Sequence, residues 1–244
     1  MNRIVVFSEM MSEKSRRAAV DFLKKGDIVY ALGDSSTVVP DGATVLNVDR
    51  TDPNSIAQAV ESIKEDKIDL LVLSNGVHGD ADGTVREHHS IDAMADVMDK
   101  NLLCNYFLVD AIVPRMQKGG MKRIAVLTET KASNNETKET TDFAYAMSAA
   151  ATNMMQRLLF NKLRPEGFTF RNFADDGKPG GMCAADYFCC NLCDDPNDAY
   201  IHADENRLAS SKWNVPSTFV VMKGSGLAME LSLCDSAAKC TIES

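Results

Sequence analysis

Short apolar runs alternate with longer stretches of helical periodicity along most of this 244-residue chain. The apolar runs, which we interpret as strands, cover residues 4–7, 28–32, 44–48, 70–73, 124–127 and 168–170. Between them, apolar side chains recur at the three- and four-residue spacing of helices over residues 15–25, 54–63, 91–116 and 143–163. Strands that alternate with helices favour a parallel sheet with right-handed crossovers. We therefore predict an α/β fold, a doubly wound parallel sheet in a Rossmann-like three-layer sandwich.

The length and charge of the chain limit its organisation and its partners. A chain of 244 residues can form one core, so we predict a single domain over 1–244, with an irregular segment from 194 onward in which only 218–222 has the pattern of a strand. The formal net charge of −9 argues against nucleic acid and against an anionic membrane surface. No stretch approaches the roughly 20 apolar residues of a membrane span, and residues 4–7 are too short for a secretory signal. We expect a cytoplasmic protein without a membrane or nucleic-acid partner.

The cysteines and histidines do not form a metal-binding pattern. Cys183, Cys189, Cys190 and Cys193 lie in one short segment. We interpret them as small apolar side chains of a helix, because the ligands of structural zinc sites have knuckle spacings and lie in turns. His88-His89 has no third ligand at a suitable spacing. The sequence therefore predicts no metal site. His78 follows the fourth strand, at the end of the sheet where α/β proteins bind ligands, and it is a candidate for ligand contact.

Several short motifs follow the predicted elements in a fixed order. They are Val48-Asp49-Arg50-Thr51-Asp52 after the third strand, Ser74-Asn75-Gly76 after the fourth, Asn101 in the long helix, Lys122-Arg123-Ile124-Ala125-Val126 at the fifth strand, Tyr145-Ala146-Met147-Ser148-Ala149 in the last long helix, and Arg164-Pro165-Glu166-Gly167 after it. Their order and spacing resemble the short-chain dehydrogenase/reductase superfamily, from the first residue to about 193. The resemblance implies an oxidoreductase that binds NAD(P) and acts on a hydroxyl or carbonyl group.

The resemblance also assigns candidate site residues. Catalytic roles would fall on Tyr145, Asn101 and Thr128, with Glu129 as the neighbouring alternative at the position of the family serine. Asp34 could accept a ribose hydroxyl, which would favour NAD over NADP, although a turn-capping aspartate explains it as well. The candidate cofactor-binding residues are Ser8, Asp34, Asp49, Asn75 and Gly76.

The glycine-rich phosphate turn of the family is absent. Its pattern is Thr-Gly-x-x-x-Gly-x-Gly, and its glycines fall here at Glu9, Glu13 and Ser15. Those glycines permit close backbone approach to the pyrophosphate, whereas glutamates add bulk and negative charge at that place. With Ser12 as N-cap, we expect Glu13 to satisfy the positive end of the first helix from within the chain. We therefore expect no bound NAD(P).

The catalytic set of the family is also incomplete. Ala149 replaces the family lysine, so Tyr145 would keep a pKa near ~10 in the absence of a cationic neighbour. A carboxylate at Glu129 would repel a developing alkoxide. The Pro-Gly that follows the sixth strand in the family reads Asp175-Asp176 or Asp176-Gly177, and residues 177–181 lead into the next helix without the substrate lid of the family.

These departures favour a degenerate family member, a structural or regulatory subunit without catalysis of its own. The helices at 91–116 and 143–163 form the main dimer interface of the family, so we expect a homodimer, a tetramer or a hetero-oligomer with an active relative. The first alternative is a working NAD(P)-dependent oxidoreductase with an altered site. The second is a small-molecule binding module that uses the crevice near Gly76 and His78 for a ligand without phosphates.

Overall fold

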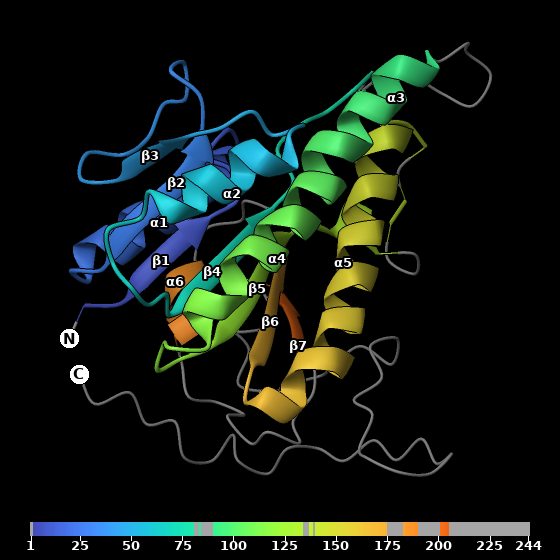
Figure 1. The fold of residues 1–244 in the computed structure, drawn as a ribbon. Coiled ribbons are helices and arrows are strands. Elements are labelled where there is room, and N and C mark those ends of the chain that lie inside the picture. The colour runs from blue at the N-terminus through green and yellow to red at the C-terminus, as the bar shows by residue number, and fades with distance from the viewer. Residues whose placement is uncertain are drawn as a thin grey trace, which may run out of the picture.

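The computed structural model describes residues 2–80, 83, 90–133, 137, 138, 140–174, 183–189 and 201–204. Their strands form one seven-stranded sheet in the order β3-β2-β1-β4-β5-β6-β7, and every adjacent pair is parallel (Figure 1). The predicted doubly wound α/β fold is confirmed. The strands are β1 (Ile4–Phe7), β2 (Ile28–Gly33), β3 (Thr44–Asn47), β4 (Leu70–Ser74), β5 (Arg123–Thr128), β6 (Thr169–Ala174) and β7 (Ile201–Asp204).

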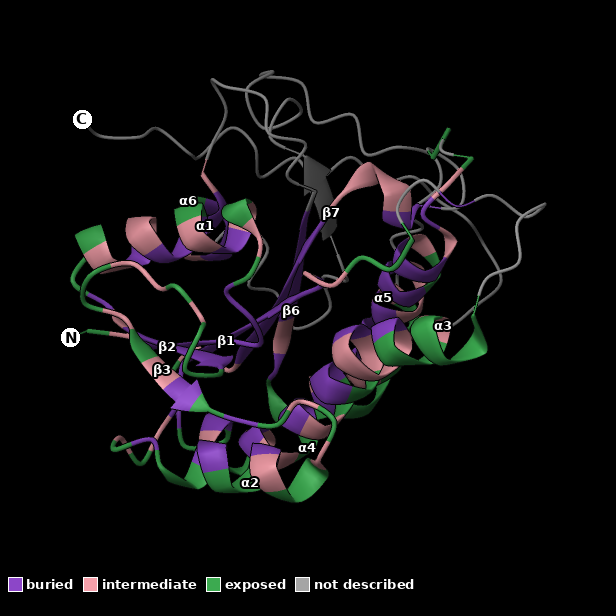
Figure 2. Cartoon of the chain, turned by 90° about the horizontal axis from the view of Figure 1, so that it is seen from above, coloured by how far each residue is buried: buried purple, intermediate pink, exposed green. Residues whose placement is uncertain are grey.

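Helices cover both faces of this sheet. Seen from above, α1 and α6 lie on one side and α2, α4 and α5 on the other (Figure 2). Successive strand residues point to opposite faces, so Val5 and Phe7 of β1 pack toward α1 while Ile4 and Val6 pack in the core toward α2 and α4. The helices are α1 (Glu13–Lys24), α2 (Pro53–Glu61), α3 (Ile91–Met98), α4 (Cys104–Met116), α5 (Phe143–Leu163) and α6 (Ala184–Cys189).

Local sequence signals set where the first helices begin and end. The Ser12 side chain accepts a hydrogen bond from the Ser15 amide and caps α1, as predicted. Gly26, at φ 80°, follows that helix in the left-handed region that glycine adopts most readily. Asp52 caps α2, and Pro53 stands in its first turn, where the missing amide hydrogen has no helical partner to lose.

The predicted helix over 91–116 is interrupted. A π-helical turn, η1 (Asp99–Leu103), separates α3 from α4 and contains the buried Asn101. Apolar periodicity alone does not reveal such a turn, because it inserts only one residue into the helical spacing. Wide turns of this kind occur frequently at functional sites.

Two other expectations require correction. The sixth strand runs from Thr169 to Ala174 rather than over 168–170, because the buried polar residues Arg171 and Asn172 hide its continuation from a search for apolar runs. Strand β7 lies in the segment expected to be irregular.

Some expectations concern residues outside the described part of the chain. They are the lid region 175–181, the side chains of His88 and His89, the pair Cys190 and Cys193, and the strand at 218–222. Among the described helices, none has the length and apolar character that crossing a membrane requires.

Candidate functional site

The carboxyl ends of β1, β4 and β5 meet at one edge of the sheet. The strand order changes direction between β1 and β4, which is the place where doubly wound sheets bind ligands. The loop after β1 contains Glu9, the loop after β4 contains Gly76 and His78, and the segment after β5 contains Glu129. The predicted site residues of these loops are therefore neighbours in space.

The carboxylate of Glu9 is buried at the first turn of α1. It accepts hydrogen bonds from the Met11 amide at 2.5 Å and the Ser12 amide at 3.1 Å. The hydroxyls of Ser12 and Ser15 donate to its other oxygen at 3.1 and 2.5 Å. Burial alone would raise the pKa of Glu9, but these hydrogen bonds outweigh it and hold the pKa below its ordinary value. Glu9 is therefore an internal anion at the start of the helix.

Glu13 does not have the role that the sequence suggested. Its side chain is exposed in the first turn of α1, where a negative charge is favourable, but Glu9 and Ser12 satisfy the amides there. Ser15 and Ser8 extend the network to β4. The Ser15 and Ser74 hydroxyl oxygens lie 3.0 Å apart, and the Ser74 amide donates to the Ser8 hydroxyl at 2.9 Å.

Gly76 lies directly against Glu9. A Cβ built on Gly76 would stand 2.5 Å from a carboxylate oxygen of Glu9 and 3.3 Å from the Cβ of Met11. The first distance is shorter than real Cβ contacts and the second is tighter than most of them, so Gly76 provides the space that the Glu9 carboxylate needs. The family glycine that the sequence retains here accommodates a side chain of the chain itself.

Asp34 and Asp49, predicted to contact the adenosine half of the cofactor, are exposed and stabilise their own turns. Asp34 accepts from the Ser36 amide at 2.8 Å and from the Thr37 hydroxyl at 3.2 Å. Asp49 accepts from the amide of Thr51 at 2.9 Å and from its hydroxyl at 2.7 Å. These hydrogen bonds hold the pKa of each carboxyl below its ordinary value. For Asp34, the turn-capping alternative accounts for every hydrogen bond that its carboxylate makes in the described residues.

Asn101 and Asn75 form part of a buried amide network. Asn101 accepts from the Val77 amide at 3.1 Å and donates to the Val77 carbonyl at 2.7 Å. It also donates to the Ser148 hydroxyl at 2.9 Å, so the π-helical turn is fastened to both the loop after β4 and α5. The Asn75 amide lies 3.3 Å from the Thr152 hydroxyl. Both asparagines link elements of the fold at the predicted site.

Tyr145 has a cationic neighbour, which the sequence did not predict. The Lys14 ammonium, from the first turn of α1, lies 3.2 Å from the Tyr145 hydroxyl and 2.7 Å from the Glu129 carboxylate. The Tyr145 hydroxyl itself donates to Glu129. The Lys14–Glu129 ion pair therefore joins the first helix to the end of β5 above the crevice.

Glu129 determines how Tyr145 titrates. Burial of the ring and the negative charge of Glu129 together raise the pKa of Tyr145 well above its ordinary value, despite the nearby ammonium. Burial alone would raise the pKa of Glu129, but the charge of Lys14 and the hydrogen bonds from Lys14 and Tyr145 together hold the pKa of that carboxyl below its ordinary value. The expectation of an unperturbed Tyr145 is therefore wrong, and the tyrosine stays a neutral phenol at physiological pH. Thr128 is buried in β5, and the Tyr145 hydroxyl bonds to Glu129 instead.

His78 and Asp142 form a second polar pair beside Tyr145. The His78 Nδ1 lies 2.9 Å from an Asp142 carboxylate oxygen, and Lys131 lies 3.4 Å from the same oxygen. The His78 ring stacks on the Tyr145 ring with centroids 4.0 Å apart and planes inclined by 13°. Sequence reasoning singled out His78 and missed Lys14, Lys131 and Asp142. Charged residues in loops have no periodicity that would reveal which loops meet.

The parallel sheet, its switch point and the motifs around it define a Rossmann-type fold, and comparison with known proteins gives the family. The enoyl-(acyl carrier protein) reductase family model matches residues 31–171, more than half of the chain, which therefore belongs to the short-chain dehydrogenase/reductase superfamily. The C-signal protein of Myxococcus xanthus is 33% identical over 103 residues, which cover 41% of this chain and 60% of that protein. The match thus spans less than two thirds of that relative.

Solved structures show the same fold at low sequence identity. A Burkholderia multivorans short-chain dehydrogenase/reductase with bound NADP is 18% identical, with 84% of this chain and 97% of that chain covered and a TM-score of 0.66. The ligand-free aldohexose dehydrogenase of Thermoplasma acidophilum is also 18% identical, with 72% and 68% covered and a TM-score of 0.60. The Pseudomonas aeruginosa RhlG/NADP complex is 16% identical, with 72% and 73% covered and a TM-score of 0.61.

The family implies a dinucleotide, and the residues of this crevice do not fit one. A pyrophosphate at the start of α1 would need the Met11 and Ser12 amides, which already bond to the Glu9 carboxylate. It would also need the space beside Gly76 that this carboxylate fills. A second anion there would meet the negative charge of the buried Glu9 carboxylate, and the Lys14 ammonium of the same helix turn is already paired with Glu129. Phosphate and Glu9 therefore exclude each other in this conformation.

Among the described residues, no group of three or more histidine, cysteine or acidic side chains is arranged to hold a metal ion.

Proposed function

We propose that this protein is a short-chain dehydrogenase/reductase subunit without dehydrogenase activity of its own, and that it associates through α4 and α5 with a second copy or with an intact relative. The observation that supports loss of activity most directly is the Glu9 carboxylate, which bonds to the helix amides at the phosphate position. The neutral Tyr145, bonded to Glu129, removes the proton-transfer group of the family in addition. The name of the Myxococcus relative describes a signal and no reaction.

The outer face of α5 supports the association. An ordinary surface helix buries its apolar face and exposes its polar face. Helix α5 departs from this rule. Its polar side chains Ser148, Thr152 and Gln156 are buried, while its apolar side chains Met154 and Leu158 are each 61% exposed. The side chains Met147, Met154 and Leu158 recur at i, i+7 and i+11 and therefore lie along one side of the helix.

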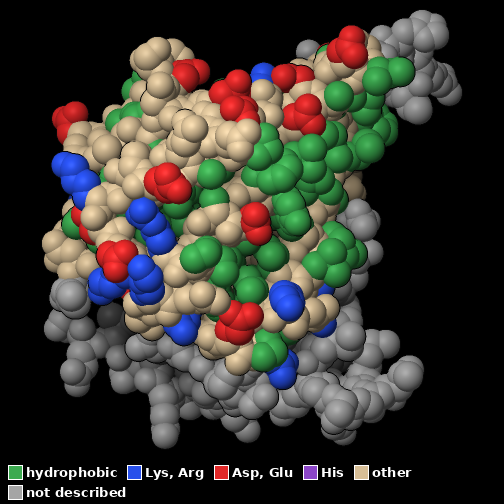
Figure 3. All heavy atoms as spheres, viewed as in Figure 1, with side chains coloured by type: hydrophobic (Ala, Val, Ile, Leu, Met, Phe, Trp, Pro, Cys, Tyr) green, Lys and Arg blue, Asp and Glu red, His purple; other side chains and the backbone are tan. Residues whose placement is uncertain are grey.

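The neighbouring helix continues this apolar surface. Leu103 of η1 and Tyr106 of α4 are 44% and 50% exposed. Figure 3 shows hydrophobic side chains gathered over α4 and α5, on the face that Figure 1 presents to the viewer. An exposed apolar patch that spans two long helices is typical of an association surface. We call Leu103, Tyr106, Met147, Met154 and Leu158 the outer patch.

Loss of cofactor binding is tested by calorimetric titration of the chain with NADPH and NADH. We expect no saturable binding tighter than about 0.1 mM, which is an ordinary affinity range for such cofactors. The matched controls are an intact short-chain dehydrogenase under the same conditions and this chain with Glu13→Gly, which changes an exposed glutamate. Saturable binding of either dinucleotide by the wild-type chain at micromolar concentration would contradict the proposal.

Association is tested by sedimentation velocity at micromolar concentration. We expect the wild-type chain to sediment as a dimer or larger species, alone or when mixed with an intact relative, and the double variant Met154→Asp/Leu158→Asp to sediment as a monomer in both cases. Val38→Asp is the matched control, because Val38 is exposed and apolar but lies outside α4 and α5. A wild-type chain that remains monomeric both alone and in the mixture with an intact relative would refute the proposed association.

The position of Lys14 favours a second candidate function, an NAD(P)-dependent oxidoreductase with a rearranged site. The Lys14 ammonium lies 3.2 Å from the Tyr145 hydroxyl and supplies the cation that Ala149 cannot. Its charge is neutralised by Glu129, which is why we prefer the inactive subunit. The dinucleotide titration separates the two functions, since the oxidoreductase requires binding and the subunit excludes it.

A further inference from the structure

The pair formed by His78 and Asp142 has no role in the proposed function, and we call it the dyad. It lies where the loop after β4 meets the start of α5, and the Tyr145 ring packs against it. The His78 Nδ1 and an Asp142 carboxylate oxygen are 2.9 Å apart. A carboxylate beside an imidazole holds the ring in one orientation and stabilises the positive charge that the ring acquires in a reaction. The dyad therefore has the arrangement of a reactive histidine.

The contacts of His78 leave its second ring nitrogen free. Because a carboxylate accepts a hydrogen bond, Nδ1 of the neutral ring carries the proton and Nε2 keeps a lone pair. The Asp142 side chain is 2% exposed, whereas the His78 side chain is 45% exposed. Asp142 covers the Nδ1 edge of the ring and Tyr145 covers one ring face, with centroids 4.0 Å apart. The opposite face and the edge that bears Nε2 are what these contacts leave open, and none of the described residues bonds to Nε2.

The conformation of Asp142 indicates that its carboxylate serves His78 instead of its own helix. Asp142 stands at the N-cap of α5, where an aspartate ordinarily accepts from a helix amide, but its side chain makes no capping bond. Its backbone is in the left-handed region, at φ 59° and ψ 40°, which is unfavourable for a residue with a Cβ. Such strain in a polar cluster is typical of a functional site.

Tyr145 gives the imidazole a rigid support. The Tyr145 ring is buried, and its hydroxyl donates to Glu129, which is paired with Lys14. Because the tyrosine is held at its hydroxyl end, the His78 ring that stacks on it, with planes inclined by 13°, keeps one orientation. A group that is held in place before a reaction loses less freedom on reaching the transition state.

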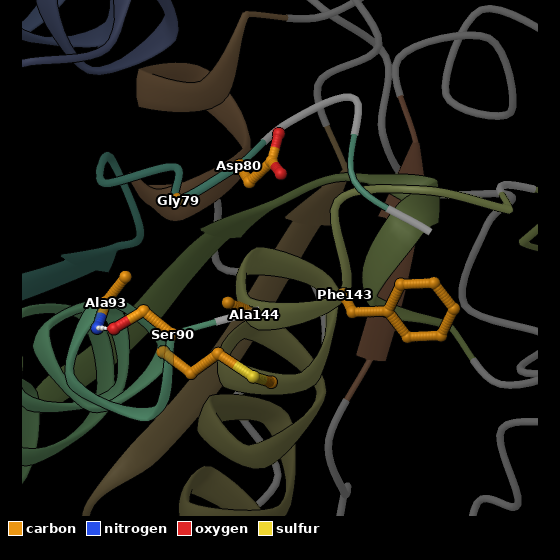
Figure 4. Close-up of a pocket in the computed structure, with 7 residues that line it drawn as sticks. Gly79, Asp80, Ser90, Ala93, Phe143 and Ala144 are labelled. Carbon is orange, nitrogen blue, oxygen red and sulfur yellow. Dashed lines mark hydrogen bonds between the residues drawn. The ribbon is translucent and has the colours of Figure 1, made fainter. Parts of the chain in front are cut away.

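A pocket of about 240 Å³ lies near the dyad, between the first turns of α3 and α5 (Figure 4). Gly79 and Phe143 line it, and each directly follows a member of the dyad in the chain, but the dyad itself is not part of the lining. Ala93, an exposed residue of α3, is another lining residue. The pocket is therefore a separate hollow, and a side chain that fills it from Ala93 should leave the dyad unaffected.

We propose that Nε2 of His78 is a nucleophile that hydrolyses small aryl esters from solution, with Asp142 as its positioning residue. Nε2 bonds to the ester carbonyl carbon, and the carbon–oxygen bond breaks with its electron pair on the departing phenolate. The Asp142 carboxylate stabilises the positive charge of the acylated ring. Water then adds to the acyl carbon, the bond to Nε2 breaks with its pair returning to the nitrogen, and the carboxylic acid releases a proton to solvent. No dinucleotide takes part, so this activity does not depend on the proposed loss of cofactor binding.

The activity is tested by hydrolysis of p-nitrophenyl acetate by the full chain, followed by the absorbance of p-nitrophenolate. The measurement is made at about pH 7.5, where an ordinary histidine is mostly neutral. We expect a second-order rate constant at least about tenfold above that of N-acetylhistidine, because the oriented carboxylate stabilises the charged ring in the transition state.

Two substitutions assign the activity to the dyad. His78→Gln removes the nucleophile and should lower the rate constant at least about tenfold. Asp142→Asn keeps the size of the side chain but removes its charge, and it should also lower the rate constant about tenfold. The Nδ1 proton of His78, which resonates far downfield when a carboxylate accepts it, should move upfield in the Asp142→Asn spectrum. A purely structural role of Asp142 would not produce that shift.

Two matched variants control for charge and for the pocket. Asp96→Asn removes an exposed carboxylate that is paired with Lys100, and Ala93→Phe fills the pocket. Both should hydrolyse the ester at the wild-type rate. Modification of the wild-type chain with diethyl pyrocarbonate gives a measurement that does not depend on the folding of a variant. The loss of activity should follow the ethoxycarbonylation of His78 in peptide maps, and hydroxylamine should restore it.

Hydrolysis no faster than that by N-acetylhistidine, a wild-type rate in His78→Gln, or activity that survives complete modification of His78 would each overturn the proposal. Equal losses of rate in Asp142→Asn and Asp96→Asn would overturn the role of Asp142.

Discussion

Two helices at the edge of this sheet begin beside a buried carboxylate, and the two carboxylates have different surroundings. At α1, both oxygens of Glu9 accept hydrogen bonds, from two amides and two hydroxyls. At α5, one oxygen of Asp142 faces His78 and Lys131 while the other has no partner among the described residues. The first carboxylate completes its helix, and the second leaves its own helix uncapped.

The difference separates a closed site from an open one. A buried charge with every lone pair satisfied is stable and resists a competing ligand. Asp142 is different, because it has an unfavourable left-handed backbone and its carboxylate orients the accessible imidazole of His78. A polar ring therefore stays accessible at the surface. The crevice of the family is therefore closed at its phosphate end, and its polar character persists at the other end, beside Tyr145.

Removal of the Glu9 carboxylate should have the largest effect. Glu9→Ala would leave the Met11 and Ser12 amides and the Ser15 hydroxyl without their acceptor in a buried place. We expect it to lower the free energy of unfolding by about 3 kcal/mol, because buried polar groups that lose a charged partner are costly. Glu13→Ala, at an exposed glutamate of the same turn, should change it by less than about 1 kcal/mol. Urea denaturation measures both, and equal effects of the two substitutions would contradict the closed site.

Glu9 should also make the protein sensitive to acid. The folded-state pKa of Glu9 lies below its unfolded value of about 4.3. Its contribution to stability is therefore fully present above that pH, and it is lost as the pH falls through the lower folded-state pKa. Glu9→Gln cannot titrate, so the stability difference between wild type and this variant should shrink as the pH falls from 5 toward 2. A difference that stays constant over this range would show that folding does not lower the pKa of Glu9.

The smallest effect should come from Asp142. Glycine adopts the left-handed backbone of this position without a Cβ penalty, which offsets the loss of contacts to His78 and Lys131. We expect Asp142→Gly to change the free energy of unfolding by less than about 1 kcal/mol. Thermal denaturation of this variant beside Glu9→Ala compares the two carboxylates directly. A loss as large as that of Glu9→Ala would mean that Asp142 has a structural role of the same weight.

Much of the fold could be predicted from the sequence, because it depends on periodicity. The pattern of apolar side chains placed α5 at the residues that form it and placed the first five strands to within one residue at each end. It could not place the π-helical turn at Asn101 or the full length of β6, where buried polar residues replace apolar ones.

The candidate site was predictable only in part. The alignment of motifs located Glu9, Gly76, Asn101 and Tyr145, which the fold brings to one edge of the sheet. It could not reveal that Lys14 reaches Tyr145 or that Asp142 reaches His78, since these contacts join loops that are far apart in the sequence. Hydrogen bonding also reversed the importance of the two glutamates, because only Glu9 has its carboxylate within reach of the helix amides.

A crystal structure of the chain grown with millimolar NADP⁺ tests most directly whether Glu9 closes the phosphate position. We expect the Glu9 carboxylate to stay bonded to the Met11 and Ser12 amides and no diphosphate to lie beside Gly76. Ordered diphosphate at those two amides, with Glu9 displaced from them, would contradict this expectation.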